Sequence, residues 1–317
     1  MSDASYNEIW NPVLQYVLYF MRTNPKRRQS YMRLTRDLNR FAHALADKEL
    51  RARDHFADID WPMIFNAYER KRMYGARYLF DTPFWCATTG WEKLWSAYCL
   101  SHILSHETAR PRAYVELGCG YGKLLFDIHK ETLDNGIRLL GVDLSRIGVD
   151  CANLVFSLLD GDGARPFTSV TVGNVSSLAP SQFDCGGLDA IIFSVSALNK
   201  VETLPNDLYA MIRTSLRHAG AVEIVHVETT GWQLYRNQEL GQFFSELGDR
   251  VQGFDPSHAP KLEKQAAKNM AMGANVNLMQ VIAEAHRAGQ VRVRNVFMNT
   301  FTPNSIEPYS VIHLELI

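Results

Sequence analysis

Short apolar runs recur through the second half of the chain and predict the strands of a sheet. Five of them cover residues 114–117, 139–143, 169–175, 188–194 and 221–228. A brief continuous apolar run is typical of a parallel strand that is buried on both faces. Two further β-rich runs, 291–298 and 309–316, flank a loop with two prolines, which suits an antiparallel pair. The pattern predicts an α/β fold with a doubly wound, seven-stranded, mostly parallel sheet that ends in an antiparallel β-hairpin.

The first 110 residues have a helical pattern instead. Apolar residues recur at spacings of three and four, which places them on common helix faces. The two stripes are Val13, Leu14, Val17, Leu18 and Met21, and then Tyr31, Leu34, Leu38, Phe41 and Leu45. We expect a helical extension or lid over 1–110 and a catalytic domain over 111–317, with an insertion at about 231–289. A further helix is predicted to end at 217–220, where a basic turn precedes a glycine.

A glycine-rich turn follows the first predicted strand, and an acid closes the second strand. The turn and its leading acid contain Glu116, Gly118, Cys119, Gly120 and Gly122. Glycines let backbone N–H groups approach a ligand that a Cβ would exclude. At the end of the second strand, the carboxylate of Asp143 is placed to accept the hydroxyls of a ribose. A dinucleotide site needs a glycine at the sixth position, where this chain has Lys123.

The Glu116–Gly122 run resembles motif I of the class I S-adenosylmethionine-dependent methyltransferases, and the likeness extends over about residues 110–317. It implies that the turn passes under the methionine part of S-adenosylmethionine, and that Glu116 orders the loop and helps hold the amino end. It also implies that Asn174 meets the adenine amine. Further cofactor contacts are expected from Leu144, Val175 and Ser194.

Composition limits the partners and the compartment. The 317 residues carry a net charge of −1, so no overall field favours nucleic acid or an anionic membrane. Seven basic residues lie between positions 22 and 40, and we interpret them as a solvated helix face because acids follow soon after. The five cysteines form no CxxC pair, which indicates reduced thiols and no metal site. No signal peptide or membrane span is predicted, so we expect a cytoplasmic protein.

Aromatic residues are dense between Trp61 and Trp95. The commonest reason for such density is core packing. The alternative is an aromatic lid that excludes water and presents π faces to a sulfonium cation. The run 82–91 has a loop-like composition just before the catalytic domain. The candidate acceptor-binding residues are Tyr74, Tyr78, Trp85 and Trp91.

Methyl transfer to a hydroxyl or a protonated amine also needs a base. Ligands of open α/β sheets lie beyond the carboxyl ends of the strands, where His226, Glu228 and Tyr121 are the candidates. His226 is the first choice, although a histidine in a strand is more often structural. The fourth strand lacks the Asn/Asp-Pro-Pro-aromatic signature of base N-methyltransferases and has no acid at its end. We therefore expect a small-molecule methyltransferase acting on oxygen or nitrogen; the alternatives are a peptide or protein methyltransferase and a non-catalytic scaffold.

Overall fold

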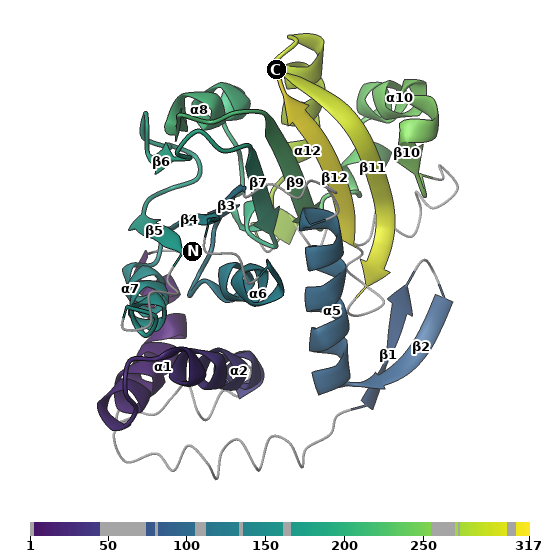
Figure 1. Cartoon of the computed structure of the whole chain (residues 1–317). Coiled ribbons are helices and arrows are strands. Elements are labelled where there is room, and N and C mark those ends of the chain that lie inside the picture. Colours follow the sequence, from purple (N-terminus) through teal and green to yellow (C-terminus); the bar gives the residue numbers. More distant parts are fainter. Residues whose placement is uncertain are drawn as a thin grey trace.

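The structure is a computed structural model that describes residues 3–44, 74–79, 82–104, 112–132, 136–160, 166–254, 270–271, 273–302 and 309–317. Within these ranges, only the backbone is described for 3–9, 12, 39–44, 74–93 and 299–302. In the described part of the chain, one large sheet is covered by helices on both faces (Figure 1).

Five parallel strands form one side of the sheet. They are β3 (Ala113–Leu117), β4 (Arg138–Asp143), β5 (Phe167–Val172), β7 (Ala190–Val195) and β9 (Val222–Glu228). Their spatial order is β5-β4-β3-β7-β9. The chain first adds strands on one side of β3 and then on the other, so the strand order reverses between β3 and β7 while all five strands stay parallel. The antiparallel pair β11 (Val291–Thr302) and β12 (Tyr309–Leu316) continues the sheet, with β12 next to β9. These seven strands, of which the last two form the antiparallel hairpin, confirm the predicted fold class.

Three additional strands enlarge this sheet to ten in the described ranges. β1 (Tyr74–Leu79) and β2 (Thr82–Ala87) form a hairpin, and Tyr78 of β1 pairs with Thr302 at the end of β11. β10 (Val251–Gln252) pairs in parallel with β11. The prediction of a loop over 82–91 is wrong, because the run forms β2 and the first turn of a helix. Its aromatic residues favour strands, and the proline lies in the outermost strand, where no further strand needs its missing N–H.

The helices lie in two layers against the sheet. The helices α5 (Thr88–Ile103), α6 (Lys123–Thr132) and α7 (Arg146–Ser157) belong to one apolar core with one face of the sheet. The helices α8 (Leu208–Ser215), α10 (Gln238–Glu246) and α12 (Leu278–Arg287) belong to the core on the other face. The short elements β6 (Phe183–Asp184), η1 (Leu198–Lys200), α9 (Gln233–Arg236) and η2 (Gly248–Arg250) connect them.

The N-terminal helices α1 (Asp3–Thr23) and α2 (Arg28–Ala44) form a third layer outside α6 and α7 (Figure 1). The apolar stripes expected from the sequence face the core: Val13 and Val17 of α1 are fully buried, as are Leu34 and Leu38 of α2. Leu14, Leu18 and Met21 are partly buried, while the side chain of Phe41 and the whole of Leu45 lie outside the described residues. Tyr31 stacks on Phe156 with the ring centroids 6.2 Å apart. No helix in the described ranges is both long enough and apolar enough for a bilayer crossing.

The helix predicted to end at 217–220 ends earlier. α8 stops at Ser215, and the next two residues form β8 (Leu216–Arg217), which pairs with β6. His218 rather than Gly220 adopts the left-handed backbone conformation, with φ of 52°. Glycine is needed at position 220 because the backbone there passes close to Asp189: a Cβ would lie 2.4 Å from Asp189 Oδ1.

Candidate functional site

The glycine turn connects β3 to α6 at the carboxyl edge of the sheet. Gly118, Gly120 and Gly122 all have positive φ, of 76°, 52° and 82°, which side-chain-bearing residues rarely adopt. Gly118 is also fixed by close contact, since a Cβ would lie 2.4 Å from the Cβ of Ala197, just after β7. Cys119 fits because its side chain is small and buried, and burial raises the pKa of its thiol well above its usual range. The thiol therefore stays protonated, which disfavours a nucleophilic role.

Asp143, at the end of β4, is hydrogen-bonded to the glycine turn. One carboxylate oxygen of Asp143 accepts the N–H of Gly120 at 2.7 Å, and the other accepts the N–H of Ser145 at 2.8 Å. Burial raises the pKa of Asp143, and these two N–H groups oppose that change. Each carboxylate oxygen has a second acceptor position, so the pair of oxygens retains capacity for a ligand's hydroxyls.

Glu116 lies at the end of β3, beneath the turn. Its side chain is buried, and burial and then the nearby Asp143 raise its pKa well above the usual range. Its Oε2 atom has no hydrogen-bond partner in the described part of the chain. A buried, unpartnered carboxyl oxygen in a native site needs a bound group or water to satisfy it.

Trp10 of α1 covers the turn, which the sequence did not indicate. A Cβ at Gly120 would lie 3.2 Å from the Trp10 ring, and the ring packs edge-on against Tyr121 at 5.3 Å. The indole Nε1 atom is buried and, among the described residues, has no hydrogen-bond partner. The helical stripe of α1 predicted its buried face, but no spacing rule connects residue 10 with a turn more than a hundred residues later.

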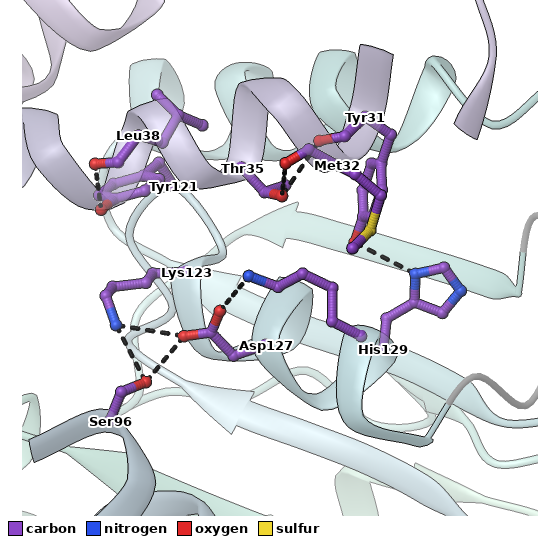
Figure 2. A network of polar contacts seen from close by, with 10 residues as sticks. Tyr31, Met32, Thr35, Leu38, Ser96, Tyr121, Lys123, Asp127 and His129 are labelled. Atoms are coloured by element: carbon purple, nitrogen blue, oxygen red, sulfur yellow. Dashed lines mark hydrogen bonds and ion pairs between the residues drawn. The ribbon is translucent and has the colours of Figure 1, made fainter. Parts of the chain in front are cut away.

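Figure 2 shows how polar contacts attach neighbouring helices to the base of this turn. Lys123, the first residue of α6, contacts both Asp127 Oδ2 and Ser96 Oγ of α5 at 3.2 Å. On the other side, the His129 ring lies 3.2 Å from the Tyr31 hydroxyl of α2. Tyr121, a predicted catalytic residue, is buried with its hydroxyl 3.5 Å from the Leu38 carbonyl oxygen.

The predicted adenine-side residues lie on loops after β4 and β5. Leu144 is an exposed apolar residue next to Asp143, and Val175 is buried. Asn174 is exposed, and its side-chain oxygen accepts the N–H of Ser176 at 2.9 Å. These residues border the strand ends that the glycine turn occupies.

The predicted catalytic residues His226 and Glu228 belong to a fully buried chain of hydrogen bonds together with Ser194, a predicted cofactor contact. Ser194 Oγ donates to Glu228 Oε1 at 2.7 Å and lies 2.9 Å from His226 Nδ1. The Tyr209 hydroxyl lies 3.2 Å from His226 Nε2. The Ser194 hydroxyl donates its single hydrogen to Glu228, so it can only accept from His226. The imidazole proton is therefore assigned to Nδ1. Burial lowers the pKa of His226 to about 3, so the ring is neutral.

Glu228 in turn holds the segment after β7. Its carboxylate accepts backbone N–H groups from Ala197, Leu198 and Asn199, at 3.1 to 3.2 Å. Burial raises the pKa of Glu228, and these hydrogen bonds oppose the rise. The carboxylate acts as a cap for η1, where N–H groups would otherwise be unsatisfied. Both ring nitrogens of His226 and both oxygens of Glu228 are therefore committed to partners within the fold.

The candidate acceptor residues Tyr74, Tyr78 and Trp85 lie on the β1–β2 hairpin, and Trp91 lies in the first turn of α5. β11 runs parallel to β9, so its far end, where β1 pairs, is at the same edge as the glycine turn. The side chains of these four residues lie outside the described ones, so their role stays a prediction.

Other aromatic residues, not singled out from the sequence, meet at this edge. The rings of Trp95 in α5 and Tyr309 in β12 are 4.4 Å apart, and the Tyr309 hydroxyl lies 2.6 Å from Ser196 Oγ. Trp95 is the last residue of the aromatic segment 61–95 and was not chosen as a candidate. Tyr309 could have been predicted as a site residue, because it begins the last strand, which starts at the carboxyl edge of the parallel strands.

No family model and no curated protein matches this sequence. Among solved structures, the chain is similar to a geranyl diphosphate methyltransferase in complex with GPP and sinefungin. The two share 15% identity and a TM-score of 0.46, over 72% of this chain and 79% of that one. It is also similar to the magnesium protoporphyrin IX methyltransferase of Synechocystis PCC 6803, with 12% identity and a TM-score of 0.41, over 72% and 81%. A plantazolicin methyltransferase has 13% sequence identity and a TM-score of 0.42, over 71% of this chain and 83% of that one. The fold type rests on the strand order of the sheet itself.

Proposed function

We propose that this chain is an S-adenosylmethionine-dependent methyltransferase that acts on a small molecule at oxygen or nitrogen. The observation that carries the proposal is the contact between the glycine turn and Asp143. Three glycines of positive φ and a carboxylate meet at the carboxyl ends of adjacent parallel strands. Ligands of open α/β sheets bind at this edge, next to the point where the strand order reverses.

The residues around the turn fit this cofactor. Asp143 would hold the ribose hydroxyls, while Leu144, Asn174 and Val175 would border the adenine. The turn itself would lie along the methionine part, and the unpartnered oxygen of Glu116 suits an ammonium or a bridging water. Lys123 stands where a dinucleotide turn has its third glycine, and its ammonium is held by Asp127 and Ser96.

S-adenosylmethionine carries a methyl group already activated by a sulfonium, so the protein mainly has to align the acceptor and exclude water. We propose that His226 and Glu228 serve this alignment indirectly. Their hydrogen bonds fix the backbone of 197–199, and Ala197 packs against Gly118 of the turn. A neutral imidazole whose two nitrogens are already engaged has no free position for an acceptor proton.

Titration calorimetry with S-adenosylmethionine, S-adenosylhomocysteine and NAD tests the proposal. We expect both sulfur ligands to bind and NAD not to bind. Binding of NAD alone would end the methyltransferase hypothesis, and labelled methyl transfer to peptides but to no small molecule would favour the peptide or protein alternative.

One observation favours the non-catalytic alternative. Trp10 lies directly over Gly120, within contact distance of the position that a Cβ would take. If α1 keeps this ring on the turn, the turn is closed to a ligand and the domain serves as a scaffold. Absence of binding by all three ligands, with binding restored in Trp10→Ala, would support a permanently closed turn.

A further inference from the structure

Two partly exposed hydroxyl groups meet at the carboxyl edge of the sheet. Ser196 Oγ and the Tyr309 hydroxyl are 2.6 Å apart, and both residues are partly exposed, in contrast to the fully buried His226 and Glu228. Ser196 immediately precedes Ala197, whose Cβ faces Gly118 of the glycine turn. The hydroxyl pair is therefore one residue from the backbone that contacts the proposed cofactor site.

Ser196 is held in a strained conformation. Its φ is 54°, a left-handed value that is uncommon for a residue with a side chain. Strain of this kind persists where the surroundings impose it, and it concentrates at functional sites. Here the N–H of Ser196 is bonded to the Val227 carbonyl at 3.0 Å, and Glu228 holds the three residues that follow. The strained backbone aims the Ser196 hydroxyl at Tyr309.

Aromatic rings stand beside the hydroxyl pair. The Trp95 ring is 4.4 Å from the Tyr309 ring and is stacked on Tyr98, with 6.1 Å between centroids and 23° between planes. Rings at such distances and offsets form the kind of wall against which a planar aromatic ligand stacks.

Unpartnered polar atoms also lie in the segments that follow β7 and β9, the first of which contains Ser196. They are Asn199 Oδ1, Thr230 Oγ1 and Trp232 Nε1, and their residues are at most 6% exposed. A buried polar atom without a partner is unfavourable, so a bound group or water is expected to satisfy each of them. The hydroxyl pair itself offers an acceptor only neutral hydrogen-bonding groups, which suit a hydroxyl better than a carboxylate or an ammonium.

We propose that the Ser196–Tyr309 hydroxyl pair and the Trp95 ring form the acceptor site, and that the acceptor is an uncharged phenol. This inference rests on the proposed function and specifies its substrate class. In the reaction, the bond between the methyl carbon and sulfur breaks and leaves its electron pair on sulfur. The phenol oxygen bonds to that carbon, and its proton passes through the Tyr309 and Ser196 hydroxyls to water.

The test is a panel of 2-naphthol, 2-naphthylamine, 2-naphthoate and cyclohexanol, incubated with methyl-labelled S-adenosylmethionine and the full chain. We expect labelled product from 2-naphthol and at least tenfold less from the other three. Tyr309→Phe keeps the ring and removes the hydroxyl, so turnover should fall by about 10²-fold while cofactor affinity is kept. Tyr19→Phe, which removes an exposed hydroxyl on α1, is the matched control and should leave both unchanged.

Ser196→Gly supplies a second measurement, because glycine accepts the positive φ and removes the hydroxyl together with its Cβ. It should keep the thermal transition and lower turnover with 2-naphthol. Cofactor binding with transfer to the amine or the carboxylate but not to 2-naphthol would overturn the phenol inference and leave the proposed function intact. Wild-type turnover in Tyr309→Phe would overturn the role of the hydroxyl pair. Absence of cofactor binding would overturn the proposed function and this inference with it.

Discussion

His226 should make the protein acid-sensitive in a way that a single substitution can isolate. Burial lowers its pKa from an ordinary value near 6.5 to about 3, and its neighbours Ser194, Tyr209 and Glu228 accommodate the neutral ring. Its pKa is depressed in the folded state. Its contribution to stability is therefore fully present above pH 6.5 and is lost as the pH falls toward 3.

The magnitude follows from the two pKa values. At pH 5.0 the unfolded chain binds nearly one more proton at this position than the folded protein does. Since one pKa unit corresponds to about 1.4 kcal/mol, His226 should reduce the free energy of unfolding by about 2 kcal/mol between pH 7.5 and 5.0. His226→Gln removes this term. The stability difference between wild type and variant should therefore shrink by about 2 kcal/mol over that range.

Urea unfolding followed by circular dichroism at both pH values measures this difference. His129, whose pKa burial lowers to about 4, adds acid sensitivity to both proteins alike and cancels. His218→Gln, at an exposed histidine whose contact with Asp184 is open to solvent, is the surface comparison and should change the pH dependence of stability far less than His226→Gln does. An equal loss of stability in wild type and His226→Gln would show that His226 titrates normally in the folded protein, and the buried hydrogen-bond chain would then be wrong.

Three shorter predictions concern the glycine turn. Gly118→Ala should lower the free energy of unfolding more than Gly187→Ala does. Both glycines have positive φ, but only a Cβ at Gly118 would meet another atom, the Cβ of Ala197 at 2.4 Å. Equal losses in differential scanning calorimetry would contradict this. Trp10→Phe keeps a ring over the turn but removes the unpartnered N–H, so we expect cofactor affinity to fall; unchanged affinity in titration calorimetry would show that the indole only packs against the turn. Asp143→Ala should weaken cofactor binding by about 1.5–3 kcal/mol for each lost charge-assisted hydrogen bond, while the exposed Asp150→Ala should not; equal affinity would remove Asp143 from the ribose site.

The sequence predicted the sheet because its signals are local. Runs buried on both faces are continuous and apolar, so the five parallel strands and the terminal pair were found within a few residues. The position of Asp143 at the end of the second strand followed from spacing, whereas its hydrogen bond to the N–H of Gly120 was not predicted. The hairpin β1–β2 was missed because its pairing partner, the end of β11, is more than two hundred residues away.

The chemistry of individual side chains was harder to predict. His226 and Glu228 were correctly placed at the end of the fifth strand, but a sequence does not show which groups are their hydrogen-bond partners. The alternation of β9 and β7 brings Ser194 between them, and this neighbour decides whether the imidazole is free. Likewise, the residues near Tyr309 in the sequence do not predict its contact with Ser196, because the two meet only through the order of strands β7, β9 and β12.

The same buried chain separates two explanations of a catalytic defect at His226. Tyr209, His226, Ser194 and Glu228 form an unbroken series of hydrogen bonds that ends on the backbone of η1. That backbone follows Ser196 and places Ala197 against the glycine turn, so the proposed cofactor and acceptor sites would both depend on a group that touches neither ligand.

If His226 acts by position, His226→Gln should lower turnover and raise the acceptor KM, while the pH profile of kcat keeps its wild-type shape. If His226 is the general base, turnover should fall by about 10²–10⁴-fold and the acidic limb of the profile should disappear. We expect the first outcome, because a group whose pKa is about 3 and whose two nitrogens are engaged does not titrate in the range where the enzyme would be assayed. A lost acidic limb with an unchanged thermal transition would refute the positioning role and restore His226 as the base.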